Sequence, residues 1–372
     1  MQMNSPPSVI RIIGIDGCRA LACLGVFIVN YLNKVDFNSS DYFLDFGEIS
    51  GRFGIVTLIV LSGFGLSIPF WRALAQEQRW PSTTNFWIRR FLRIAPLYYV
   101  CLIALIVHNE VWKESQGWTD IFLHFSFLYN YSNQFYYSLN PVFWVLAFFM
   151  HFYLILPILF WLGKGGTKNA MAVIITVLLL SYLVHSYLSS QADIGASGTL
   201  NPVLTKSFFA YLPHFLTGTL AGWLFLVCDR KGLFADSRFF RWFAFWLIMV
   251  LIVGGLGTRI AELMELPYAV YHFPMTPILV ALLIISAALG SASTFLESAP
   301  VRYFAILSYG VFIFHYPVIN LSLRLLPKLD VNPHQHLFLT AVFALLVTSG
   351  IAAITYALVE KPARLISRKY FS

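Results

Sequence analysis

Charged residues are scarce in this sequence of 372 residues. Asp, Glu, Lys and Arg together make up 11% of the chain, whereas a soluble domain averages about 25%. So few charges cannot cover a surface that faces water, which excludes a disordered chain, a coiled coil and an ordinary cytosolic enzyme. Apolar residues, by contrast, reach 58%, and aromatic residues reach 17%. This composition predicts a polytopic membrane protein whose main partner is the lipid bilayer.

Cysteine is also scarce, and the short motifs of several enzyme classes are missing. The four cysteines form no C-x-x-C pair and no zinc-ligand spacing, so we expect structural thiols rather than a disulfide framework or a metal site. H-E-x-x-H, G-x-S-x-G and the P-loop are all absent. Metal-dependent, serine-dependent and nucleotide hydrolysis therefore have no support, and no metal or bound cofactor is expected.

Long apolar runs recur along the whole chain. A helix needs about twenty residues to cross a bilayer, and ten runs of about that length are present. A shorter run, residues 121–131, is predicted to be re-entrant or interfacial. We therefore predict an all-α membrane bundle that forms one domain over residues 1–372, without a soluble C-terminal domain. The predicted spans are residues 12–33, 53–73, 87–108, 141–163, 169–190, 207–228, 239–258, 274–293, 304–325 and 337–359.

The basic residues are distributed unevenly between the two sides of this topology. With the N-terminus placed in the cytoplasm, 18 of the 25 Lys and Arg residues fall on inner helix ends and loops. Cytoplasmic loops of membrane proteins carry such an excess, so both termini are predicted to be cytoplasmic. The net charge of +8 is explained in this way, and no nucleic-acid partner is expected.

Ionisable residues inside a predicted span are costly and are therefore candidates for function. Arg19 lies in the first span, and Asp16 precedes it by three residues, so the two side chains share one helix face and can form an ion pair. Arg19 either presents a cation to a cavity or reaches toward the cytoplasmic surface as a topology signal. The residue pattern alone leaves both interpretations open.

Three arginines open the third span. Arg89 and Arg93 are one turn apart, and Arg90 is also within reach of Arg93, so two guanidinium groups can converge on one anion. Guanidinium binds phosphate through paired hydrogen bonds. The cluster predicts either a site for a phosphorylated cytosolic donor or lipid headgroup, or an anchor that stops translocation of the helix.

Two histidines lie deep in apolar spans, His151 in the fourth and His315 in the ninth. An isolated histidine on an apolar helix is more often a hydrogen-bonded packing residue than a catalytic one. Neither histidine belongs to a cluster of metal ligands. From position alone, a direct catalytic role is the less favoured interpretation of each.

Seven short segments between residues 14 and 364 carry distinctive motifs. They are GIDGCRALACLGVFIVNYL, VLSGFGLSI, FWIRRFLRIAPLYYV, PVFWVLAFFMHFYLILPIL, FLTGTLAGWL, LSYGVFIFHYPV and LVEKPAR. In this order they resemble the landmarks of the membrane-bound acyltransferase type 3 family. The resemblance implies about ten helices, a cytosolic acyl-CoA donor, and transfer of an acyl group to a hydroxyl of a glycan or lipid-linked intermediate. By the same resemblance we expect a bacterial plasma membrane.

The resemblance also implies roles for individual residues. Arg19 matches the arginine of an Arg-x10-His motif, and the three arginines of the third span match donor-side positions of the family. Including the ion-pair partner of Arg19, the further cavity candidates are Asp16, Trp144, Tyr153, Tyr309 and His315.

The chain departs from the family pattern where catalysis is expected. Asn30 occupies the position of the motif histidine, Phe149 that of a glutamate, and His151 that of a glutamine. Asparagine cannot accept a proton, and losing a general base typically lowers a rate by about 10²- to 10⁴-fold. Asn30 can still donate a hydrogen bond to a thioester carbonyl, which is a binding role.

Two functional hypotheses follow. In the first, the chain is a working O-acyltransferase in which His151 replaces the missing base, with Arg19 and Asn30 as the other catalytic residues and Arg89, Arg90 and Arg93 binding the donor. In the second, it is a catalytically inactive relative that binds a lipid or glycan, takes part in translocation, or forms a structural subunit with a partner protein. An ion-coupled transporter finds little support, because intramembrane carboxylates are nearly absent and no inverted repeat is present.

Overall fold

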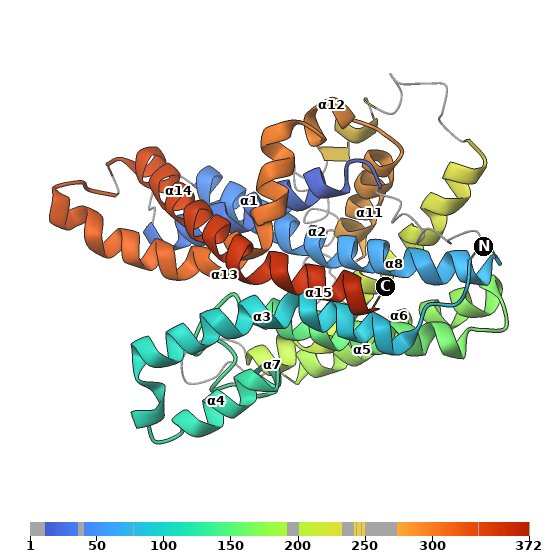
Figure 1. The fold of residues 1–372 in the computed structure, drawn as a ribbon, viewed down its shortest axis with the longest axis horizontal. Helices are drawn as coiled ribbons and strands as arrows, with labels where there is room; N and C mark the ends of the chain where they lie inside the picture. The colour runs from blue at the N-terminus through green and yellow to red at the C-terminus, as the bar shows by residue number, and fades with distance from the viewer. Residues whose placement is uncertain are drawn as a thin grey trace.

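The regular structure in the described part of the chain is helical. The computed structural model describes residues 12–35, 41–76, 78–191, 201–232, 274–333 and 335–371, together with a few positions between 242 and 249. The predicted all-α membrane bundle is confirmed (Figure 1). The α-helices are α1 (Ile15–Val35), α2 (Asp41–Leu74), α3 (Thr83–Asn109), α4 (Gly117–Phe125), α5 (Trp144–Leu162), α6 (Thr167–Ser190), α7 (Pro202–Thr205), α8 (Phe208–Arg230), α11 (Met275–Ala288), α12 (Ser293–Leu296), α13 (Ala299–Leu325), α14 (Leu337–Thr355) and α15 (Lys361–Phe371).

Eight helical stretches of the described residues are long and apolar enough to cross a membrane. They coincide with eight of the ten predicted spans. Apart from a few positions between 242 and 249, the span predicted at residues 239–258 lies outside the described residues. The span predicted at residues 274–293 corresponds to α11, which is shorter than expected, with 14 residues and a rise of about 21 Å. α11 ends early because the chain turns at Gly290, whose φ is 95°.

The apolar run at residues 121–131 is too short to cross a bilayer. It forms the second half of α4 and a 3-10 turn at Tyr129–Tyr131. α4 has nine residues and rises only about 14 Å. Its length fits the predicted re-entrant or interfacial placement, which stays a prediction.

Buried polar and ring contacts hold the segment between α3 and α5 together. His124 Nδ1 lies 2.8 Å from Asp120 Oδ1, and its ring stacks on Tyr129 with 4.1 Å between centroids. Burial raises the pKa of Tyr129 above its ordinary value, so its neutral hydroxyl donates to the Phe143 carbonyl oxygen at 2.6 Å. These contacts fill the end of the bundle at which α3 finishes and α5 begins.

Small residues set the distance between α2 and α8. A Cβ atom added to Gly218 of α8 would collide with the backbone carbonyl of Val60 in α2. A Cβ atom at Gly222, one turn later, would lie 2.6 Å from Ser67 Oγ. Close backbone approach through small residues is common where membrane helices pack. Here it fixes the position of α2 against α8.

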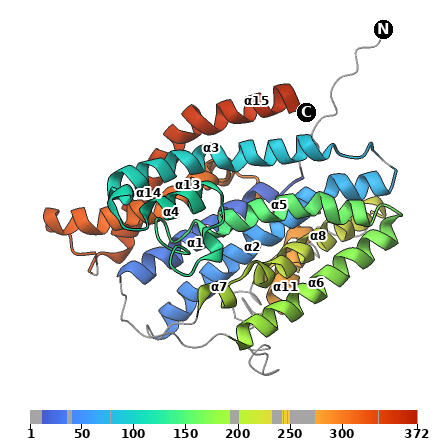
Figure 2. The same cartoon turned by 90° about the horizontal axis from the view of Figure 1, so that it is seen from below.

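The described chain returns at its end to the start of α3. Figure 2 shows α15 running alongside α3, and the two helices are in contact. Arg89, near the start of α3, donates a hydrogen bond of 2.8 Å to the carbonyl oxygen of Phe371. α1 also begins, and α2 and α5 finish, at this end of the bundle, where Arg19 and the arginines of the third span lie.

Candidate functional site

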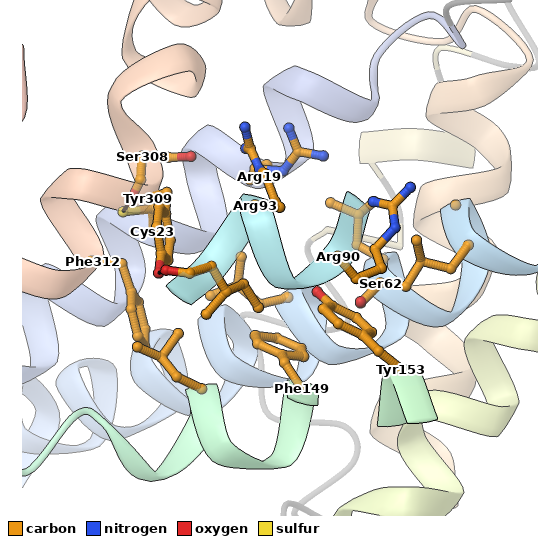
Figure 3. A pocket seen from close by; sticks show the side chains of 16 residues that line it. Arg19, Cys23, Ser62, Arg90, Arg93, Phe149, Tyr153, Ser308, Tyr309 and Phe312 are labelled. Atoms are coloured by element: carbon orange, nitrogen blue, oxygen red, sulfur yellow. Dashed lines mark hydrogen bonds between the residues drawn. The ribbon is translucent and has the colours of Figure 1, made fainter. Parts of the chain in front are cut away.

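Five helices enclose a cavity in the half of the bundle at which α1 and α3 begin. α1, α2, α3, α5 and α13 each contribute side chains to it (Figure 3). Its volume is about 310 Å³, at the lower end of the range of about 300–1,000 Å³ for pockets that bind small molecules. The lining divides into a cationic end and an apolar end.

Arg19, Arg90 and Arg93 supply the cationic end. Figure 3 shows the guanidinium groups of Arg19 and Arg93 gathered on one side of the cavity, with Arg90 beside them on α3. No Asp, Glu, Lys or His is found among the described residues that line the cavity. Asp16 Oδ1 lies 3.0 Å from Arg19 Nη1, so one of the three charges is balanced from outside the lining. The cationic end therefore attracts an anion.

Arg90 and Arg93 are fixed by the way α3 begins. Ser82 caps the helix, its Oγ accepting a hydrogen bond of 3.3 Å from the N–H of Asn85, and this places both arginines in the second and third turns. The guanidinium of Arg90 packs over Phe86, 5.5 Å from the ring centroid. Its buried Nε has no hydrogen-bond partner in the described part of the chain. An unsatisfied buried donor costs free energy, which an anionic ligand would recover.

A buried carboxylate acts on Arg93 from outside the cavity. Glu360 ends the π-helical turn Tyr356–Glu360 and forms an ion pair of 2.8 Å with Arg364. It also interacts electrostatically with Arg93. Its Oε1 is buried and has no hydrogen-bond partner among the described residues. π-helical turns are frequent at functional sites. Glu360 does not line the cavity, but it interacts electrostatically with two residues that do, Arg93 and Tyr309.

α5 presents one face to the cavity. Leu146, Phe149 and Tyr153 line it and are three and four residues apart, so they stand on the same side of the helix. Tyr153 interacts electrostatically with both Arg90 and Arg93. The phenol of Tyr153 thus belongs to the cationic end, and Leu146 lies two turns away on the same face.

α13 and α1 close the cavity with buried hydrogen bonds. Tyr309 donates its hydroxyl proton to the Ile94 carbonyl oxygen at 2.5 Å. Cys23 donates to the carbonyl oxygen of Ser308 at 3.3 Å and, like the other three cysteines, is a buried free thiol. Phe312 lies one turn beyond Ser308 and also lines the cavity.

The structure brings five of the predicted site residues to this one cavity. Their predicted roles in donor binding and catalysis stay predictions. They are Arg19, Arg90, Arg93, Tyr153 and Tyr309.

Asn30 does not line the cavity. It lies on the face of α1 that carries Arg19, but three turns and about 16 Å further along the helix. Its Nδ2 donates to the Val26 carbonyl oxygen at 2.9 Å. A hydrogen bond from Asn30 to a thioester in the cavity would therefore require the ligand to pass well beyond Arg19.

His151 faces away from the cavity. It is two residues from both Phe149 and Tyr153, which on a helix rotates its side chain by about 200°. Its ring packs against Tyr131 and Phe208, at 5.6 and 6.0 Å between centroids, and its Nδ1 is buried without a hydrogen-bond partner in the described part of the chain. The role of replacement base stays a prediction, which His151 would have to fulfil from outside this cavity.

Three further predicted residues lie outside the lining. Arg89 is engaged by the carbonyl oxygen of Phe371. Trp144 packs among aromatic rings of α5 and α8. His315 is buried one turn beyond Phe312, with its Nδ1 2.8 Å from the Phe312 carbonyl oxygen, and its Nε2 has no partner among the described residues.

Sequence reasoning missed part of the lining. Tyr153, Ser308 and Tyr309 bring hydroxyl groups to the cavity. The described lining holds one more side-chain oxygen, that of Ser62, and one sulfur, that of Cys23. Ser62 belongs to the LSGF segment, which is the signal that could have found it. The apolar lining residues resemble any other core or lipid-facing residue in sequence, so no local signal marks them.

A second cavity lies at the other end of α1. It has a volume of about 500 Å³ and is lined by Lys34, Asp330 and Asn332, together with apolar residues. The Nζ of Lys34 also lies over the ring of Tyr316, 4.7 Å from its centroid. A cation, a carboxylate and an amide together can bind the hydroxyl groups of a polar ligand.

Comparisons with known proteins point to one family over nearly the whole chain. The model of the acyltransferase 3 family, described as an acyltransferase domain, matches residues 12–357. YrhL of Bacillus subtilis is 26% identical over 391 residues, covering 96% of this chain and 56% of that protein. Peptidoglycan O-acetyltransferase OatA of Listeria monocytogenes is 23% identical over 382 residues, covering 94% and 55%. O-acetyltransferase OatA of Staphylococcus aureus is 24% identical over 388 residues, covering 96% and 58%. The chain thus spans little more than half the length of these curated relatives, and no solved structure matches it.

Proposed function

Because the chain belongs to the acyltransferase 3 family, we propose that it is a membrane O-acyltransferase that uses a cytosolic acyl-CoA. It transfers the acyl group to a hydroxyl of a glycan or of a lipid-linked intermediate. The names of all three relatives include O-acetyltransferase, which supports the type of reaction. The names of two of them include peptidoglycan, which supports a glycan acceptor.

The observation that carries this proposal is the set of three guanidinium groups on one cavity. Arg19, Arg90 and Arg93 meet there without a carboxylate in the described lining. The phosphates of CoA are the part of the donor that guanidinium recognises best, through short charge-assisted hydrogen bonds. The nucleotide itself is too large for about 310 Å³, so it stays at the cationic mouth while the acyl-bearing arm enters.

The reaction balances without another co-reactant. The acceptor hydroxyl oxygen attacks the thioester carbonyl carbon, the carbon–sulfur bond breaks, and an ester carbon–oxygen bond forms. The hydroxyl proton ends on the CoA sulfur, which leaves as a thiol.

The two cavities suggest where donor and acceptor approach. The cationic end lies in the half of the bundle where Arg89 meets Phe371, and the distribution of basic residues supports a cytoplasmic location of that half. The cavity around Lys34 and Asp330 lies at the opposite end of α1 and supplies polar groups for an acceptor. In this proposal the chain resides in a bacterial plasma membrane with both termini in the cytoplasm.

Donor binding is tested by titrating the purified full chain with acetyl-CoA. Arg90→Ala and Arg93→Ala should each weaken binding by about 10- to 100-fold, because each removes a hydrogen bond to a charged group worth about 1.5–3 kcal/mol. Arg302→Ala is the matched control, since Arg302 is exposed on α13 and outside the cavity. Equal affinity of all three variants and the wild type would contradict the proposal.

Transfer is tested with labelled acetyl-CoA and glycan acceptors in the same preparation. Labelled ester on the acceptor, with release of one CoA thiol per ester, is the expected result. The alternative function, a catalytically inactive relative, predicts CoA binding without transfer, together with a stoichiometric partner protein or bound lipid. No comparison favours that alternative.

A further inference from the structure

The last helix of the described chain is strongly basic. α15 has 11 residues, of which four are Lys or Arg and none is Asp or Glu. One of the four, Arg364, forms an ion pair with Glu360. The other three, Lys361, Arg368 and Lys369, are exposed and form no ion pair with a described residue. The outer surface of α15 therefore carries three positive charges that no described carboxylate balances.

Helical spacing divides the residues of α15 between an inward and an outward face. The side chains that are buried or half-buried against the bundle are those of Ala363, Arg364, Ser367 and Phe371. At about 100° per residue the three exposed cations lie within about 100° of one another, along one edge of the outward face. Leu365 stands among them, and Ile366 and Tyr370, 48% and 63% exposed, form the other edge. Cations and apolar side chains thus share the outward face, as in helices that lie in a membrane interface.

The length of the last helical stretch brings this face to the polar boundary of the bilayer. The stretch Leu337–Phe371 has 35 residues and rises about 52 Å, whereas the hydrocarbon core of a bilayer is about 30 Å thick. α14 has 19 residues and by itself rises about 28 Å. Because α14 is long enough to cross the core, we expect α15 to lie at the level of the lipid headgroups. Figure 2 shows it there beside the start of α3 and at the edge of the bundle.

We propose that the outward face of α15 binds the headgroup of an anionic phospholipid. Lys361, Arg368 and Lys369 contact the negative headgroup, and Ile366 and Tyr370 pack on the upper part of the acyl chains. Clusters of Lys and Arg next to a membrane-spanning helix attract anionic lipids in this way. The inference goes beyond the proposed function, since it depends on the membrane bundle and not on an acyl-CoA donor.

Two other occupants fit this face less well. In a two-fold dimer the same surface of each copy meets, so a second copy of the chain would bring the cations of α15 against themselves. The phosphates of CoA have the arginines of the cavity as partners, and the described lining of that cavity includes none of the three exposed cations of α15. An anionic lipid is the occupant whose charge complements the face.

The test places the full chain in nanodiscs of phosphatidylcholine and in nanodiscs of equimolar phosphatidylcholine and phosphatidylglycerol. Hydrogen exchange of the backbone amides of α15 reports how firmly that helix is held. Phosphatidylglycerol should slow this exchange at least about tenfold, because each Lys or Arg near an anionic surface contributes a factor of about five. Added salt should reduce the difference, since it screens exposed charges.

A triple variant locates the effect. Lys361→Gln, Arg368→Gln and Lys369→Gln together should make the exchange of α15 equal in the two kinds of nanodisc. The unfolding temperature of this variant in phosphatidylcholine should match that of the wild type, which shows that it is folded. The control removes the same charge from exposed residues at the opposite end of the bundle and should keep the wild-type response. It combines Lys113→Gln, Arg324→Gln and Lys328→Gln.

Several results would overturn the inference. Equal exchange of wild-type α15 in both kinds of nanodisc is one, and an undiminished response to phosphatidylglycerol in the triple variant is another. A dimer that the triple variant dissociates would assign the face to a second copy of the chain. A loss of acetyl-CoA affinity in the triple variant as large as that in Arg90→Ala would assign it to the donor. Binding of acetyl-CoA by the wild type tests the proposed function separately and leaves the lipid result unchanged.

Discussion

Tyr309 of α13 donates a hydrogen bond of 2.5 Å to the backbone carbonyl oxygen of Ile94 in α3. The bond links two helices that are 215 residues apart in sequence. It lies where the cationic and apolar ends of the cavity meet, since Arg93 precedes Ile94 directly. The hydroxyl of Tyr309 therefore holds α3, and with it the arginines, against α13.

We predict that Tyr309→Phe lowers the free energy of unfolding by about 1 kcal/mol, the usual contribution of one hydrogen bond. Thermal unfolding of the purified protein in detergent measures the change. Tyr303→Phe is the control, because Tyr303 lies on the same helix with 61% of its surface exposed, and it should have no effect. Equal destabilisation by both variants would show that the bond to Ile94 is not the cause.

Gly218→Ala should destabilise the bundle by about 1–3 kcal/mol, because the added methyl forces α8 away from the Val60 carbonyl in α2. Gly350→Ala is the opposite case: a Cβ there meets no atom within 4 Å, so alanine should be neutral or stabilising by up to about 1 kcal/mol. Unfolding temperatures of the two variants provide the comparison. Similar losses in both would contradict the close packing of α2 and α8.

Glu360→Ala should cost about 3 kcal/mol, because it leaves Arg364 and Arg93 without their buried carboxylate. Hydrogen exchange in α15 should rise in the same variant, since Arg364 no longer holds that helix to the π-helical turn. Glu110→Ala breaks an exposed pair with Lys113 and should cost less than about 1 kcal/mol. A Glu360 variant as stable as this control would rule out a structural role for the buried pair.

His151→Ala should reduce acyl transfer by much less than the roughly 10²- to 10⁴-fold loss expected for a general base. The reason is its position, since His151 packs against Tyr131 and Phe208 on the opposite face of α5 from Phe149. The initial rate of transfer at saturating acyl-CoA is the quantity to measure. A loss of 10²-fold or more with unchanged donor affinity would instead establish His151 as the replacement base.

Much of the fold is predictable from the sequence, because an apolar run of bilayer length has few alternatives to forming a helix. The end of α11 was harder to predict, since Gly290 is followed by small uncharged residues at 291–294, which by themselves do not mark the end of a helix. The convergence of Arg90 and Arg93 follows from helical spacing within one segment. The hydrogen bond from Arg89 to the Phe371 carbonyl oxygen could not be predicted in this way, because the two residues are 282 positions apart.

The candidate site was predictable only where one helix carries the information. The separation of His151 from Phe149 and Tyr153 could have been predicted from 100° per residue, without any structure. The meeting of Arg19 with the arginines of α3 could be suggested only by resemblance. The apolar end, with Phe312 as an example, depends on how four helices pack, and packing of apolar side chains leaves no motif.

Binding of the donor's phosphates by the cationic end is most directly tested by comparing acetyl-CoA with acetylpantetheine, which carries the same thioester without the phosphates. We predict that the wild-type chain binds acetylpantetheine at least about 100-fold more weakly, since two or more charge-assisted hydrogen bonds are lost. We also predict that Arg90→Ala weakens binding of acetyl-CoA alone. Equal affinity for the two thioesters, or an equal effect of Arg90→Ala on both, would contradict a phosphate site at Arg19, Arg90 and Arg93.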